Sequence, residues 1–115
     1  MRETYIISGL RSPIGKAKKG CFRFTRPDDL ASQVIKKLVK TTPGLKGDMV
    51  EDLIVGNAVP EAEQGMQMGR YISLLSLPKE VPGFVVNRYC GSGLEAIHLA
   101  FSKIQSGYAL SLIHI

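Results

Sequence analysis

The sequence has no tryptophan, only two cysteines and no long apolar run. A helix that crosses a membrane needs roughly 20 consecutive apolar residues, so we predict no membrane span. The opening residues, MRETYIISGL, have neither the layout of a signal peptide nor the acid-free composition of a mitochondrial presequence. We therefore expect a cytoplasmic protein.

The two cysteines, Cys21 and Cys90, lie far apart in the sequence. Distant cysteines in a cytoplasmic chain are expected to remain free thiols. The sequence also lacks a CxxC motif and any group of Cys and His at the spacing of metal ligands. We expect neither a disulfide nor a metal site.

Acidic residues are absent from residues 11–26, and the chain as a whole has a formal net charge of +5. The basic residues of this stretch are Arg11, Lys16, Lys18, Lys19, Arg23 and Arg26. Such a run is either a solvated loop or a contact for a phosphate-bearing ligand or nucleic acid. Because only Phe22 and Phe24 could stack on bases, we do not expect nucleic-acid binding.

Strand and helix patterns alternate along the chain. Apolar runs predict three strands, over residues 5–10, 51–59 and 83–87. Apolar residues at helical spacing predict three helices, over residues 27–40, 70–76 and 91–106. Pro27 suits the start of the first helix and Gly107 the end of the third, and a fourth strand would begin at Tyr108. The order β-α-β-α-β-α predicts an α/β fold with a parallel or mixed sheet, interrupted before its fourth strand.

Cys90 lies where the third predicted strand turns into the third helix, within VVNRYCGSGLEAIHLA. Ligands of α/β sheets bind beyond the carboxyl ends of the strands. A helix N-terminus carries about half a positive charge, which favours the thiolate, the nucleophilic form of cysteine. Gly91 and Gly93 leave room for a substrate, and the backbone N–H of Cys90 can face a developing oxyanion. The pattern indicates covalent catalysis by Cys90, although a buried structural cysteine would also fit it.

The helix after Cys90 is expected to keep four large apolar residues in the core: Leu94, Ile97, Phe101 and Ile104. Ala96 and Ala100 would permit close packing. His98 lies about 12 Å along the helix from Cys90, too far to act as its base. A dinucleotide fingerprint also fits GSGLEA. Such a fingerprint should follow the apolar strand directly and occupy the first strand–helix turn. Here residues 87–90 intervene, and the turn is the third, which counts against a dinucleotide site.

The motif VNRYCGSGLEAI resembles the active-site signature of the thiolases. Three further segments resemble the same family in the same order: RSPIGKAKKGCFRFTRPDDL, VEDLIVGNAVPEAEQGMQMGRYISLL and LPKEVPGFVVNRYC. The resemblance covers residues 4–109 and is strongest to the thiolases that act on 3-ketoacyl-CoA in fatty-acid β-oxidation. It implies that residues 1–109 are part of the N-terminal domain of the thiolase fold. At Gln67, relatives often have Asn.

The resemblance implies that Cys90 takes up an acyl group as a thioester, with its own N–H in the oxyanion hole. The reaction would be thiolytic cleavage of a 3-ketoacyl-CoA to acetyl-CoA and a shortened acyl-CoA, with coenzyme A as a substrate and without a metal. The family also uses a histidine in a GHP motif and a second cysteine in a CxG motif, and neither motif occurs in this sequence. We therefore expect the chain alone to be inactive in turnover. Thiolases are commonly homo-oligomers, and some join a β-oxidation multienzyme complex.

Two other functions are compatible with these residues. A β-ketoacyl synthase-like condensing enzyme also places a cysteine at the start of a buried helix. A non-catalytic acyl- or lipid-binding protein with a thiolase-like fold would keep the fold without the reaction. The RPDDL segment and the context of Cys90 favour a thiolase.

Residues 110–115 read LSLIHI, whereas the resemblance predicts an acidic residue after Ala109. The DNA string CTG TCT CTT ATA CAC ATC encodes these residues and matches the mosaic end of a transposase adaptor used in sequencing libraries. We expect residues 110–115 to be translated adaptor, in which case His114 is not a ligand. A natural truncation with an accidental tail is the alternative.

Overall fold

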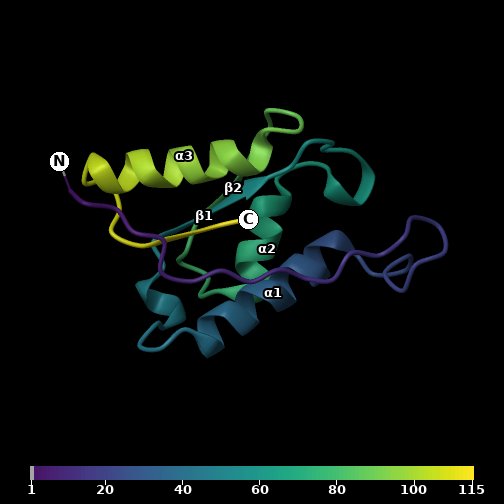
Figure 1. Cartoon of the computed structure of the whole chain (residues 1–115), viewed down its shortest axis with the longest axis horizontal. Coiled ribbons are helices and arrows are strands. Elements are labelled where there is room, and N and C mark those ends of the chain that lie inside the picture. Colours follow the sequence, from purple (N-terminus) through teal and green to yellow (C-terminus); the bar gives the residue numbers. More distant parts are fainter. Residues whose placement is uncertain (1) are drawn as a thin grey trace.

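The computed structural model describes residues 2–115. Its helices are α1 (Pro27–Thr41), α2 (Met68–Ser76) and α3 (Ser92–Gln105), and its strands are β1 (Asp52–Gly56), β2 (Gly83–Val86) and β3 (Leu112–His114). The strands form a parallel sheet in the order β2-β1-β3. The predicted α/β class is therefore confirmed (Figure 1). Within residues 2–115, none of the helices has the length and apolar character that crossing a bilayer requires.

The sheet lies between two layers of helices. Figure 1 shows α3 on one face and α1 and α2 on the other. Side chains alternate along β1, so Leu53 and Val55 pack with Ile72 of α2, whereas Ile54 packs against α3. This alternation gives the small domain two apolar clusters that share one central strand.

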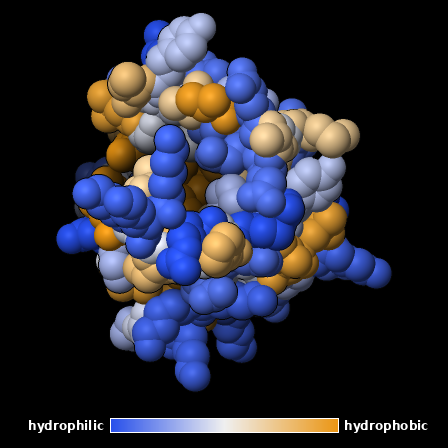
Figure 2. Space-filling model, turned by 90° about the vertical axis from the view of Figure 1, so that its right-hand side faces the viewer, coloured by the Kyte–Doolittle hydropathy of each residue, from blue (hydrophilic) through white to orange (hydrophobic). Residues whose placement is uncertain are grey.

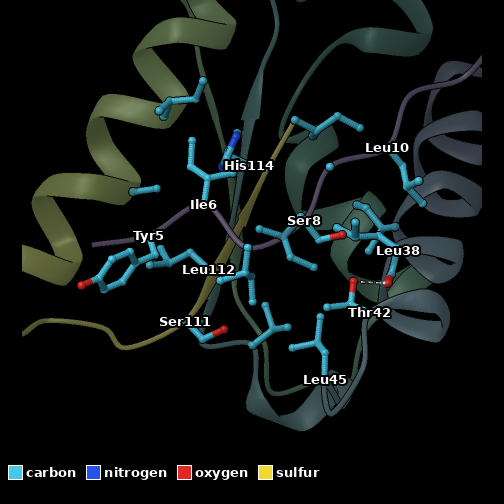
Figure 3. Close-up of a pocket in the computed structure, with 18 of the residues that line it drawn as sticks. Tyr5, Ile6, Ser8, Leu10, Leu38, Thr42, Leu45, Ser111, Leu112 and His114 are labelled. Atoms are coloured by element: carbon cyan, nitrogen blue, oxygen red, sulfur yellow. Dashed lines mark hydrogen bonds between the residues drawn. The ribbon is translucent and has the colours of Figure 1, made fainter. Parts of the chain in front are cut away.

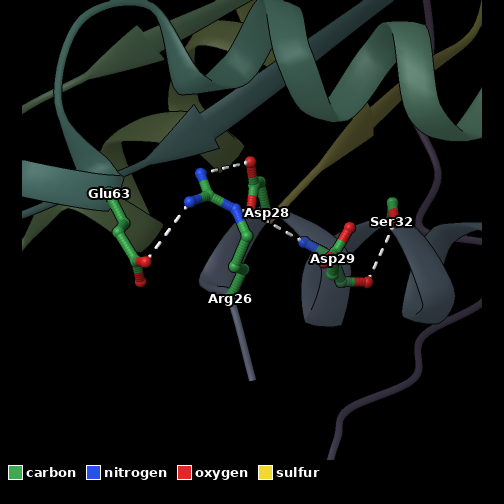
Figure 4. A network of polar contacts seen from close by, with 5 residues as sticks. All are labelled: Arg26, Asp28, Asp29, Ser32 and Glu63. Carbon is green, nitrogen blue, oxygen red and sulfur yellow. Dashed lines mark hydrogen bonds and ion pairs between the residues drawn. The ribbon is translucent and has the colours of Figure 1, made fainter. Parts of the chain in front are cut away.

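Helix α1 begins at Pro27, as predicted, and a polar network surrounds its first turn (Figure 4). The Arg26 guanidinium donates to both carboxylate oxygens of Asp28, at 3.0 and 3.1 Å, and to Glu63 at 3.2 Å. These hydrogen bonds hold the pKa of Asp28 below its ordinary value. The network ties the start of α1 to the loop that follows β1.

Helix α3 does not bury the face that the sequence predicts. Leu94 is 65% exposed and Phe101 is 45% exposed, whereas Ala96 and Ala100 are buried with Ser92. The backbones of α3 and β1 approach so closely that only small side chains fit between them. The expected core role of Leu94 and Phe101 is therefore wrong, and the expected close packing through the two alanines is confirmed.

The last turn of α3 is anchored to the beginning of β1. Lys103 forms an ion pair with Asp52, whose side chain is only 6% exposed. The Lys103 ammonium also lies 5.0 Å from the ring centres of Phe84 and Tyr108. Gly107 then ends the helix with a positive φ of 77°, as the sequence predicts.

The predicted strand over residues 5–10 does not form. Tyr5, Ile6 and Ile7 are 71 to 77% exposed. The reason is that β1 has only two edges: β2 occupies one, and β3 pairs with the other from Asp52 to Ile54. The strand β3 lies within residues 110–115, and their origin as translated adaptor stays a prediction.

We predict that the protein becomes less stable as the pH falls below the ordinary histidine pKa of 6.5, because His114 in β3 is partly buried. Burial lowers the pKa of His114 from its ordinary value of 6.5. The unfolded chain therefore takes up the proton first, so the stabilisation is complete above pH 6.5 and is lost as the pH falls toward the folded-state pKa. Urea unfolding at several pH values measures this change in the free energy of unfolding.

His114→Gln should flatten this pH dependence. The matched control is His98→Gln, because His98 is the other histidine and is exposed on α3. An equal flattening in both variants would contradict the assignment to His114.

Candidate functional site

Cys90 lies in a tight turn between the carboxyl end of β2 and the N-terminus of α3. Within this turn, Gly91 N donates to Arg88 O and Ser92 N donates to Tyr89 O, both at 3.0 Å. The Cys90 thiol is free and exposed. The prediction that Cys90 lies at the strand–helix junction is therefore confirmed, one residue before the Gly91 cap.

Two side chains shape the turn around Cys90. The Asn87 Oδ1 accepts from the N–H of Tyr89 at 2.8 Å. The buried Ser92 Oγ accepts from the N–H of Arg88 at 2.9 Å and donates to the carbonyl of Tyr89 at 2.6 Å. Tyr89 has a φ of 46°, in the left-handed region that non-glycine residues seldom adopt. The hydrogen bonds from both sides stabilise this conformation, which is the kind of local strain that gathers at functional sites.

The turn rests directly on β1. A Cβ atom added to Gly56, the last residue of β1, would lie 2.7 Å from the carbonyl carbon of Ser92. Such a contact is shorter than real Cβ contacts, so glycine is required at this position. The N-terminus of α3 is therefore held against the central strand by backbone contact.

Further contacts secure the neighbourhood of the turn. Arg88 forms an ion pair with Glu95 in the first turn of α3 at 2.9 Å. The Gln67 Oε1 accepts from the N–H of Val85 at 3.2 Å, on the edge of β2 away from β1. The structure thus gives Gln67 a defined contact with the strand that leads to Cys90.

The roles of Asn57, Asn87 and Ser92 are not among those predicted from the sequence. Asn57 is buried after β1, where its side chain donates to Gln64 O at 2.8 Å and accepts from the N–H of Val59 at 3.2 Å. A signal for both asparagines was present, because each directly follows an apolar strand, in LIVGN and FVVN. Asn side chains accept from backbone N–H groups two residues later, which begins a turn.

The other reactive side chains lie elsewhere. Cys21 is an exposed free thiol in the basic loop, and His98 is exposed on α3.

An apolar cavity of about 350 Å³ lies between residues 4–10, α1, α3 and β3. Figure 3 shows Tyr5, Ile6 and Leu112 at its wall. None of residues 87–92 lines this cavity, so it is separate from the turn that carries Cys90.

The chain belongs to the thiolase family. The family profile described as "Thiolase, N-terminal domain" matches residues 4–114. A 3-ketoacyl-CoA thiolase of Bacillus subtilis (strain 168) is 50% identical over 108 residues, which cover 93% of this chain and 27% of that protein.

Two other relatives are similar over the same part of the chain. A 3-ketoacyl-CoA thiolase of Colwellia psychrerythraea is 40% identical over 93% of this chain and 28% of its own length. One from Acinetobacter baumannii (strain AYE) is 45% identical over 90% of this chain and 26% of its own length. The chain thus spans between 26% and 28% of the length of these curated relatives.

We predict that Gly56→Ala destabilises the protein by about 1–3 kcal/mol, since its methyl group would overlap the Ser92 backbone. Urea unfolding provides the free energy. Gly93→Ala is the matched control, because a Cβ at Gly93 meets nothing within 4 Å and alanine favours a helix. Equal losses in the two variants would show that the contact between β1 and α3 is not decisive.

We also predict that Ser92→Ala costs about 1–3 kcal/mol of unfolding free energy, because the Arg88 N–H and the Tyr89 carbonyl both lose their partner. Ser102→Ala tests the same chemical change at an exposed position of α3 and should be nearly neutral. If chemical unfolding shows Ser92→Ala to be neutral as well, the hydroxyl does not hold the turn.

Proposed function

We propose that the chain is the N-terminal part of a thiolytic acyltransferase in which Cys90 is the nucleophile. The observation that carries the proposal is the exposed Cys90 thiol in a strained turn at the carboxyl end of a parallel strand. Family membership and the names of the relatives support the same reaction. The substrate would be a 3-ketoacyl-CoA, and the products acetyl-CoA and an acyl-CoA shortened by two carbons.

In the first step, the Cys90 thiolate attacks the C3 carbonyl of the substrate. The bond between C2 and C3 then breaks, so the acyl group remains on sulfur as a thioester while C2 takes up a proton and leaves as part of acetyl-CoA. The N–H groups of Gly91 and Ser92 already donate within the turn. The proposal therefore assigns the backbone N–H of Cys90 to the developing oxyanion.

In the second step, the thiol of coenzyme A attacks the enzyme thioester. A new thioester forms with coenzyme A, the Cys90 sulfur leaves as a thiolate, and the proton of the incoming thiol must be removed by a base. The family's GHP and CxG motifs, absent from this sequence, would supply acid and base. The contribution of this chain is the turn between β2 and α3, which would hold the Cys90 thiol in place for the attack.

Coenzyme A would act as a substrate and no metal would be needed. A role in β-oxidation fits the names of the relatives. Assembly of the whole enzyme as a homo-oligomer is a further part of what we propose. Location in the cytoplasm remains part of the proposal. A β-ketoacyl synthase-like enzyme would also acylate its cysteine, but the relatives named above are thiolases.

We predict that acetyl-CoA transfers its acetyl group to Cys90 and not to Cys21. Both thiols are free and exposed, so accessibility alone does not separate them. Cys21→Ser should retain a hydroxylamine-sensitive acetyl adduct by intact-mass spectrometry, whereas Cys90→Ser should form it at least about tenfold more slowly.

Alkylation by iodoacetamide at neutral pH provides a second measurement on the same two variants. Faster alkylation of Cys90 than of Cys21 is the expected result, because the thiolate is the reactive form. Equal and slow modification of both thiols in both assays would rule out Cys90 as the nucleophile of this chain.

A further inference from the structure

The basic loop, residues 11–26, is a folded unit that projects from the body of the protein (Figure 1). Gly20 N donates to Lys16 O at 2.6 Å, and Thr25 N donates to Phe22 O at 2.9 Å. A Cβ on Gly20 would lie 2.4 Å from Lys16 O, so the closure requires glycine. The Phe22 ring lies against Gly15. These contacts close the loop on itself.

Only one of the six cations of this loop has an acidic partner within residues 2–115. Arg26 pairs with Asp28 and Glu63, as Figure 4 shows. Within residues 2–115, no ion pair involves the remaining five basic residues of the loop: Arg11, Lys16, Lys18, Lys19 and Arg23. All five are exposed. The loop thus concentrates uncompensated positive charge, which attracts an anionic surface over about a Debye length.

Two large apolar side chains accompany these charges. Ile14 is 91% exposed and Phe24 is 86% exposed. The Arg23 guanidinium lies 4.6 Å from the centre of the Phe24 ring. Figure 2, which faces the end of the molecule with the loop, shows hydrophobic groups standing among hydrophilic side chains. Neither side chain is therefore covered by the rest of the chain within residues 2–115.

We propose that this loop docks the protein on an anionic membrane surface. Lipid phosphates would face the five cations, while Ile14 and Phe24 would enter the boundary between headgroups and acyl chains. Cations that border exposed apolar side chains are the pattern of segments that lie at a membrane interface. The loop carries both components on one closed turn.

The apolar side chains distinguish a membrane from other anionic partners. A soluble phosphate compound is held by donors that converge on it, and it gains nothing from Ile14 or Phe24. A nucleic acid would use Phe24 for stacking but offers no apolar medium for Ile14. The proposal concerns a surface separate from Cys90 and does not depend on the reaction assigned to that residue.

The test is flotation of the full chain with lipid vesicles in a density gradient, where aggregated protein stays at the bottom. Vesicles of equal parts phosphatidylglycerol and phosphatidylcholine should carry the protein upward, and pure phosphatidylcholine should not. Replacing Lys16, Lys18 and Lys19 with Gln should lower the partition coefficient about tenfold or more at roughly 0.1 M salt.

Two further variants make the result specific. Replacing Lys36, Lys37 and Lys40 with Gln gives the same change of net charge on exposed positions of α1 and should alter partition less than about twofold. Replacing Ile14 and Phe24 with Ser keeps every charge and should lower partition at least about fivefold.

Several outcomes would overturn the proposal. An equal loss in the α1 variant would mean that net charge alone drives binding. Unchanged partition of the Ile14 and Phe24 variant would exclude insertion of these two side chains into the lipid boundary. Release of the protein by millimolar inorganic phosphate at constant ionic strength would assign the loop to a soluble phosphate ligand. Absence of flotation, or flotation that RNA abolishes, would also exclude membrane docking.

Discussion

The backbone contact between Gly56 and Ser92 is the constraint on which the rest of the structure depends. It brings the N-terminus of α3 directly onto the central strand. Once the two backbones touch, only side chains as small as Ala96 and Ala100 fit further along the same interface. Leu94 and Phe101 of α3 consequently remain exposed. The contact also fixes the height of the turn that carries Cys90 above the end of the sheet.

Similar contacts hold the strand that leads into the turn. A Cβ on Gly69 of α2 would lie 2.5 Å from Phe84 O. The backbones of α2 and β2 are therefore in direct contact, as those of α3 and β1 are. At the far end of α3, Lys103 pairs with the buried Asp52. The turn therefore joins two fixed elements: β2 is held by the contact with α2, and α3 is held at its far end by the ion pair with Asp52. The proposed role of Cys90 as a nucleophile would need such support, because a small displacement of the reacting atom is costly to the rate.

The chemistry and the proposed membrane contact occupy different kinds of structure. Cys90 lies on a short turn whose geometry depends on neighbouring elements, through Asn87 and Ser92. The basic loop is closed by its own backbone and by Phe22, so its charges depend little on the sheet. Apolar side chains are also exposed at residues 5–7 and on α3. Exposed apolar surface of this kind marks places where further protein contacts form.

The sequence by itself determined the features that depend on neighbouring residues. Pro27 and Gly107 mark helix ends because their backbone preferences act locally, and the strand–turn–helix pattern located Cys90 for the same reason. The alternation of strands and helices likewise predicted an α/β fold.

Only the tertiary structure decided which segments pair and which faces are buried. Residues 5–10 have a strand-like pattern but remain unpaired, because β3 takes the available edge of β1. The buried face of α3 was decided by the close approach at Gly56, a contact between residues far apart in sequence that no local pattern encodes.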